Sequence, residues 1–182
     1  SAILHSLKCL NITNKDQVII SSFTCDAVTK AVINSGAKIV YVDINADLTM
    51  NDKCVMQAIN KNTKVLILQN TFGRLGLKTK TINEIKKKNI FIIGDSCLSA
   101  GSEFKDHSLE QFGDVSIFSL EASKTITIGW GGVLKINNTK YKKKNISNYN
   151  TLKSINIFSD LRRLFQLLIS SYLLKYQKSF GN

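Results

Sequence analysis

Asp95, Ser119 and Lys124 are the side chains whose types and spacing could together do chemistry. Lys124 lies five residues after Ser119 and follows an apolar run, and Asp95 follows a second apolar run, Ile90–Ile93. An amine, a carboxylate and a hydroxyl are what pyridoxal phosphate (PLP) requires for its aldehyde, its pyridine nitrogen and its phosphate. The three residue types therefore predict a PLP site, on the condition that the fold brings them to one place.

The elements that must position these residues can be read from the hydrophobic pattern. Six apolar runs of strand length recur along the chain: Val18–Ile20, Ile39–Ile44, Val65–Leu68, Ile90–Ile93, Val115–Phe118 and Val133–Ile136. Segments of helical pattern separate the early runs: Cys25–Ser35, Asn51–Asn60 and Lys80–Lys88. This alternation predicts an α/β fold of three layers, with a mostly parallel sheet flanked by helices. In such sheets ligands bind at the carboxyl ends of the strands, so Asp95 and Lys124 are expected at one shared edge.

Composition excludes several classes of function. The formal charge of +12 is dense only at Lys86–Lys88 and Lys140–Lys144 and comes without a nucleic-acid-binding motif, so we expect no nucleic-acid partner. A weaker alternative is an anion or nucleic-acid binder. Cysteine and histidine residues are few and show no CxxC pair, so neither a metal site nor a redox dithiol is predicted, and a reduced cytoplasm is expected. The apolar stretch Leu164–Leu174 is too short to span a bilayer, so no stable membrane insertion is expected.

Three regions are predicted along the chain. Residues 1–137 form the partial cofactor-binding domain, 138–150 form a polar linker, and 151–182 contain an amphipathic helix, from about Leu152 to Gln177, that leads toward a mostly missing small domain. Ser1 opens without a methionine directly in a helical pattern. The chain is therefore expected to be the interior of a longer protein, truncated at both ends.

Nine short sequence words occur together and in order along residues 16–132. They are Asp16 to Val18, Ser22-Phe23-Thr24, Gly36-Ala37-Lys38, Val42-Asp43-Ile44, Thr71-Phe72-Gly73, Gly94-Asp95-Ser96-Cys97, Phe112-Gly113-Asp114, Phe118-Ser119 to Lys124, and Gly131-Gly132. Together they resemble the DegT/StrS family of PLP-dependent sugar aminotransferases. The resemblance implies the large domain of a fold type I enzyme, with an active site at a homodimer interface.

The resemblance also implies a role for each candidate residue. Lys124 is expected to be the Schiff-base lysine and proton shuttle, Asp95 to pair with the pyridine nitrogen, and Ser119 to bind the phosphate. Cys25 stands where the family usually has an aromatic residue that stacks on the cofactor ring, and Leu98 stands where it usually has Gln or His. Both positions are expected to contact the cofactor, with fewer contacts than in the family.

The function implied is transfer of an amino group, with glutamate as the expected donor, to a nucleotide-linked keto-sugar in polysaccharide or lipopolysaccharide biosynthesis. Two alternatives stay open. One is a non-catalytic fragment or degenerate relative that serves as a fold or dimerisation module. The other is a PLP-dependent sugar dehydratase, which the presence of Lys124 disfavours because dehydratase relatives can carry histidine there.

Overall fold

The computed structural model describes residues 2–124, 126–150, 158, 161, 162, 164–166, 168 and 169. Contacts within the chain divide it into two units, Ser1–Tyr149 and Asn150–Asn182. The described residues of the second unit are helical and exposed, and most of the helix predicted from Leu152 to Gln177 lies outside the described residues. No helix in the described part of the chain is long and apolar enough to cross a bilayer.

The first unit is built on a six-stranded sheet with the strand order β2-β1-β3-β4-β7-β8. The strands are β1 (Gln17–Ser21), β2 (Lys38–Val42), β3 (Thr63–Gln69), β4 (Phe91–Asp95), β7 (Val115–Ser119) and β8 (Gly132–Ile136). Neighbouring strands are parallel except β7 and β8, which form an antiparallel hairpin. A separate two-stranded sheet joins β5 (Glu103–Phe104) to β6 (His107–Ser108). The prediction of a mostly parallel α/β sheet is confirmed.

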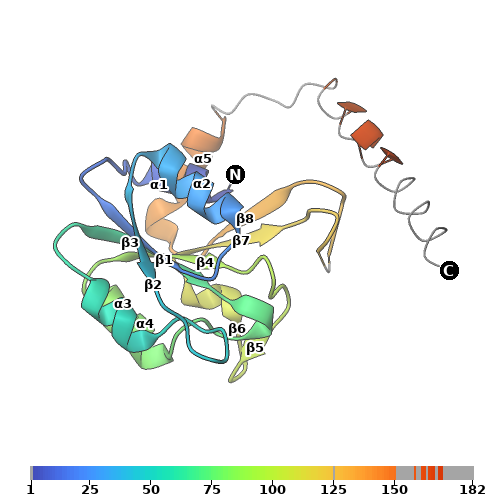
Figure 1. The fold of residues 1–182 in the computed structure, drawn as a ribbon. Helices are drawn as coiled ribbons and strands as arrows, with labels where there is room; N and C mark the ends of the chain where they lie inside the picture. Colours follow the sequence, from blue (N-terminus) through green and yellow to red (C-terminus); the bar gives the residue numbers. More distant parts are fainter. Residues whose placement is uncertain are drawn as a thin grey trace. The chain divides into compact units, whose positions relative to one another are not determined.

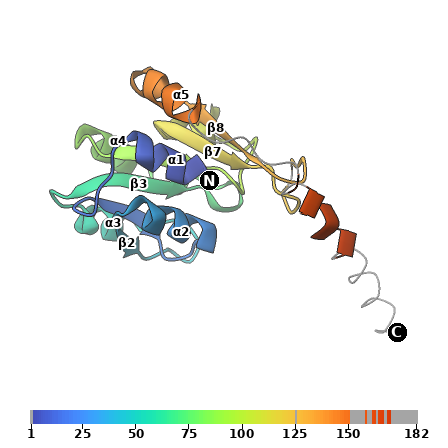
Figure 2. The same cartoon turned by 90° about the horizontal axis from the view of Figure 1, so that it is seen from above.

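Helices cover both faces of this sheet, which gives the three layers seen in Figure 1. The α-helices are α1 (Ala2–Cys9), α2 (Asp26–Ser35), α3 (Asp52–Ala58), α4 (Thr79–Lys87) and α5 (Lys142–Asn150). Short 3-10 turns are η1 (Thr71–Gly73), η2 (Leu109–Phe112) and η3 (Thr139–Tyr141). Helices α1, α2 and α5 lie above the sheet in Figure 1, and α3 and α4 lie below it. Figure 2 shows the same arrangement from above.

The strands are apolar on both sides because each side faces a different core. In β3, Val65 and Ile67 pack in the core beneath α1 and α2, whereas Leu66 and Leu68 pack in the core against α3 and α4. Successive side chains of a strand point to opposite faces. An unbroken apolar run is therefore what a central parallel strand needs, and this explains why the runs in the sequence lack polar alternation.

The polar stretch 138–150, expected as a linker, instead forms η3 and α5 and belongs with the first unit. Asn145 is 3% exposed, and its side chain donates to the Tyr141 carbonyl at 2.9 Å while its own carbonyl lies 3.2 Å from His5 Nε2. The Tyr141 ring packs edge-on against Phe91, with 4.6 Å between centroids. The side-chain nitrogen of Asn145 is thus hydrogen-bonded inside the fold, whereas its Oδ1 is buried without a partner among the described residues, and composition alone does not show such burial.

Candidate active site

Strand register brings Asp95 and Ser119 to the same face at the carboxyl edge of the sheet. Asp95 ends β4 and pairs with Ile117 of β7, and Ser119 follows two residues later in β7. Paired residues of neighbouring strands share a face, as do residues two apart in one strand. Ile117 belongs to the core beneath α1 and α2, so both polar side chains project toward that helical layer.

Asp95 is a buried carboxyl group at the end of a central strand, with 6% of its surface exposed. Its Oδ1 accepts a hydrogen bond from the Cys97 amide at 3.1 Å, and the Cys97 thiol also donates to the carboxylate. Burial raises the pKa of Asp95 above that of an ordinary carboxyl, although the Cys97 hydrogen bonds and the positive charge of Lys124 oppose this. None of the ion pairs in the described part of the chain involves Asp95.

Lys124 and Ser119 lie in the hairpin that connects β7 to β8. Ser119 pairs with Gly132 of β8, and its Oγ accepts a hydrogen bond from the Glu121 amide at 3.4 Å. Lys124 is half-buried, and its amide donates to the Glu121 carbonyl at 2.9 Å. Its charge acts on both Asp95 and Cys97. The fold therefore gathers the three residues at one edge, as the strand pattern predicts.

The structure places the other two predicted cofactor contacts, Cys25 and Leu98, in loops after parallel strands. Cys25 is the exposed N-cap residue of α2. Leu98 lies three residues after Asp95 with 46% of its surface exposed. A side chain on so exposed a loop is not stabilised by burial in the hydrophobic core of this unit.

Cys97 is a site residue that its sequence position alone did not reveal. Its thiol hydrogen-bonds Asp95, and burial together with the nearby Asp95 charge raises the pKa of Cys97 well above that of a free thiol. This thiol is thus a neutral donor to the carboxylate rather than a nucleophile. The only signal in the sequence was its place in the word Gly94-Asp95-Ser96-Cys97.

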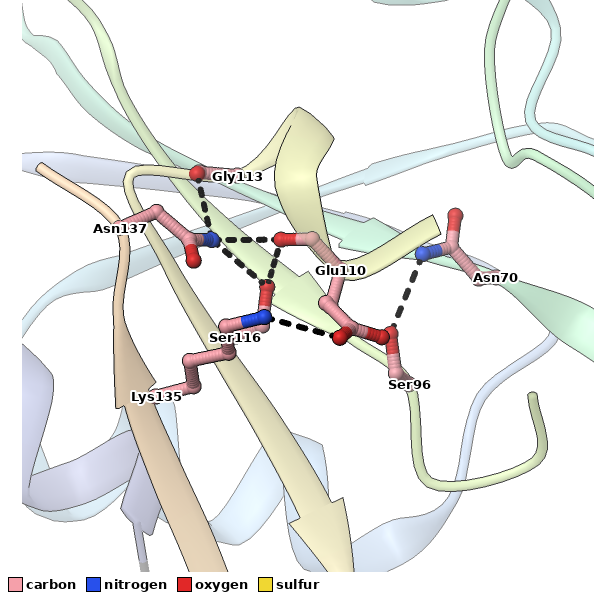
Figure 3. A network of polar contacts seen from close by, with 7 residues as sticks. All are labelled: Asn70, Ser96, Glu110, Gly113, Ser116, Lys135 and Asn137. Carbon is pink, nitrogen blue, oxygen red and sulfur yellow. Dashed lines mark hydrogen bonds and ion pairs between the residues drawn. The ribbon is translucent and has the colours of Figure 1, made fainter. Parts of the chain in front are cut away.

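A polar network holds β7 in place behind the site (Figure 3). Ser116, which is fully buried, donates from Oγ to the Glu110 carbonyl at 2.6 Å. Asn137 Nδ2 donates to the carbonyls of Glu110 and Gly113 and to Ser116 Oγ. These bonds join η2 and the end of β8 to β7, and β7 carries Ser119.

Comparison with known proteins now decides the family. The profile of the DegT/DnrJ/EryC1/StrS aminotransferase family matches residues 1–154. The chain belongs to this family. Its match covers the whole sheet and every candidate site residue, so the predicted resemblance is confirmed.

Curated relatives align with most of the chain. GDP-perosamine synthase of Escherichia coli O157:H7 is 32% identical over 136 residues, which are 74% of this chain and 37% of that protein. UDP-4-amino-4,6-dideoxy-N-acetyl-beta-L-altrosamine transaminase of Campylobacter jejuni is 31% identical over 134 residues, 71% of this chain and 36% of that protein.

A solved structure supports the same relationship. The Streptococcus pneumoniae protein Spr1654, in its PLP form, superposes with a TM-score of 0.69 at 27% identity, over 80% of this chain and 43% of that one. The chain therefore spans well under half the length of the relatives it matches.

Proposed function

We propose that the chain forms the PLP-binding part of an aminotransferase that moves an amino group from an amino acid to a nucleotide-linked keto-sugar. The observation that carries the proposal is that Asp95, Ser119 and Lys124 meet at the carboxyl edge of the sheet, with Asp95 and Ser119 on the same face. The family match over residues 1–154 includes all three residues and supports this proposal.

The residues present at this edge fit PLP. Asp95 is buried without an ion pair among the described residues, and a buried carboxylate is stabilised by a cationic hydrogen-bond donor such as a protonated ring nitrogen. The hydroxyl oxygens of Thr24 and Ser99, next to Cys25 and Leu98, are also buried with no partner in the described part of the chain. Unpaired buried polar atoms are uncommon in folded proteins and are typical of sites that take a polar ligand.

Each residue would then have one task. When bound, PLP supplies an aldehyde carbon and an electron-accepting ring. The Lys124 amine would hold the cofactor by its aldehyde and, once released, would carry a proton as general acid and base. Asp95 would hold a proton on the ring nitrogen, and the Ser119 hydroxyl would donate to the phosphate. Lys124 is half-buried and its charge acts on Asp95, which supports a role for both groups in one site.

The expected substrate class follows from the relatives. The names of the E. coli and C. jejuni proteins place a GDP-linked and a UDP-linked amino sugar, respectively, in their reactions. We extend this class to the present chain: a nucleotide-linked keto-sugar as acceptor and glutamate as donor, for polysaccharide or lipopolysaccharide synthesis. The cytoplasm, where nucleotide sugars are made, is the expected compartment, and the four free cysteines suit it.

A homodimer is part of the proposal. Apolar side chains from two loops of the carboxyl edge are exposed: Phe72 by 64%, Ile126 by 60% and Ile128 by 74%. Exposed apolar side chains gathered near a site are typical of surfaces that a partner covers. Sedimentation velocity should show a dimer that substitution of Ile128 by aspartate dissociates, and a chain that sediments as a monomer at all concentrations would exclude it.

Cofactor attachment tests the central assignment. Purified chain mixed with PLP should develop a visible absorption band, and borohydride reduction followed by peptide mapping should find the cofactor on Lys124. Lys124→Arg should abolish the band and the labelled peptide, whereas Lys105→Arg, at an exposed lysine in the turn between β5 and β6, should leave both unchanged. Label spread over many surface lysines would refute the proposal.

Turnover then separates an enzyme from a binding module. Glutamate added to the loaded chain should yield 2-oxoglutarate in an amount stoichiometric with bound cofactor. A chain that carries PLP on Lys124 but converts no glutamate would instead be a fold or dimerisation module. Release of water from the sugar with no net transfer of nitrogen would identify a dehydratase.

A further inference from the structure

Gln69 connects the end of β3 to the loop that carries Cys25. It is the last residue of β3 and pairs in register with Asp95. Its Nε2 donates to the Phe23 carbonyl at 2.9 Å and to Thr71 Oγ1 at 2.9 Å. One side chain thus holds both the loop after β1 and the start of η1 beside the strand that ends at Asp95.

Asn70, the next residue, connects the same strand end to the Asp95 turn. Asn70 is 1% exposed, and its amide donates to the Asp95 carbonyl at 2.9 Å. Its Nδ2 donates to Ser96 Oγ at 3.4 Å, as Figure 3 shows, and its Oδ1 accepts from the Gly76 amide at 3.1 Å. A Cβ at Gly76 would lie 2.2 Å from the Gln69 carbonyl, so the loop returns tightly onto the strand end.

We infer that Gln69 and Asn70 form a positioning clamp for the cofactor site. Two adjacent amide side chains hold three separate connections, those after β1, β3 and β4, at the edge where Asp95 and Cys25 lie. Neither residue touches the cofactor in this assignment, so both are positioning residues rather than catalytic ones. The inference deepens the proposed function and depends on it for the identity of the ligand.

An amide suits this task because it donates and accepts at once without charge. Asn70 uses its oxygen toward Gly76 and its nitrogen toward Ser96. A carboxylate at position 70 would place a further buried negative charge near Asp95. Reaction rates depend strongly on the positions of the reacting groups, and a displacement of about 1 Å can lower the rate about 100-fold.

The loss of each amide should have a local effect that global destabilisation does not reproduce. Gln69→Glu keeps the shape of the side chain but cannot donate to the Phe23 carbonyl. In the cofactor-free chain, amide hydrogen exchange should accelerate in residues 22–26 and stay unchanged in α4. Gln57→Glu makes the same chemical change at an exposed position of α3 and should alter neither exchange nor PLP binding.

The positioning role of Asn70 is tested by measurements on the turn after Asp95 and on the bound cofactor. Asn70→Ala should accelerate amide hydrogen exchange at residues 96–98 and raise the dissociation constant for PLP at least tenfold. It should also shift the pH midpoint of the visible absorption band of the bound cofactor. A purely structural role would lower Tm without moving that midpoint. Where Asn70→Ala fails to fold, Asn70→Ser and Gln69→Glu supply the same measurements.

Two results would overturn the clamp. One is unchanged exchange in both loops of the Gln69 and Asn70 variants, and the other is PLP affinity within twofold of the unmodified chain together with an unmoved pH midpoint. If the unmodified chain binds no PLP, the proposed function fails, whereas the exchange measurements still decide whether the clamp holds the two loops.

Discussion

Replacing Asp95 by asparagine should stabilise the cofactor-free chain at neutral pH and at the same time remove its PLP binding. Asp95 is 6% exposed, and within the described part of the chain its carboxyl group accepts hydrogen bonds only from Cys97. Asparagine has the same shape and can still accept from the Cys97 amide, but it carries no charge to bury. Opposite effects on stability and on cofactor binding are typical of a residue kept for function.

The direction of this change in stability follows from proton binding to Asp95. Burial raises the folded-state pKa of Asp95 above its value of about 3.9 in the unfolded chain. At a pH between the unfolded-state and the folded-state pKa, Asp95 binds more protons in the folded chain than in the unfolded chain. The free energy of unfolding therefore falls as pH rises between these two pKa values, and it stays lower at higher pH. Each unit of separation is worth about 1.4 kcal/mol. At roughly 2–4 °C per kcal/mol for a chain of this size, one unit corresponds to about 3–6 °C in Tm.

Thermal unfolding followed by circular dichroism between pH 3 and pH 8 measures this effect. Asp47, Glu110 and Glu121 have lowered pKa values and contribute the opposite trend, which loses stability as pH falls. That trend is common to both proteins, so the difference curve between Asp95→Asn and the unmodified chain isolates Asp95. Asp106→Asn makes the same substitution at an exposed aspartate and is the matched control. An Asp95→Asn chain that is no more stable at pH 7, or a difference independent of pH, would refute the reasoning.

Three further outcomes are expected. In urea titrations, Asn137→Ala should lower the free energy of unfolding by about 2–3 kcal/mol, because the buried Gly113 carbonyl loses its donor. The control Asn34→Ala, on the exposed face of α2, should change this free energy by under about 0.5 kcal/mol. Leu98→Gln should tighten PLP binding about two- to tenfold in absorbance titrations, since one hydrogen bond is worth about 0.5–1.5 kcal/mol; unchanged affinity would place this loop away from the cofactor. Iodoacetamide should label exposed Cys25 well before Cys97, whose pKa is raised, and peptide mass spectrometry would expose the reverse order.

Much of the site could be predicted from the sequence because its parts follow strands. Apolar runs predict parallel strands, and the ends of such strands meet at one edge whatever the separation along the chain. Asp95, Ser119 and Lys124 could therefore be grouped from the sequence alone, and the family resemblance added Cys25 and Leu98. Register then showed that Asp95 and Ser119 also share a face.

The residues that hold the site were harder to predict. Gln69 and Asn70 bond to groups from residue 23 to residue 96, and a polar residue after an apolar run is equally typical of any turn. Helix α5 was missed for a related reason, since its buried Asn145 hydrogen-bonds to Tyr141 and to His5 of α1. Hydrogen-bond partners so distant in sequence leave no local pattern.

The sequence by itself determined the layered α/β architecture, the family and the chemistry that three side chains can do, because hydrophobic periodicity and residue type are local properties. Tertiary structure decided the protonation behaviour of Asp95, the neutral state of the Cys97 thiol and the clamp at the end of β3. Burial and hydrogen bonding between distant segments set these properties, and they exist only once the chain has folded.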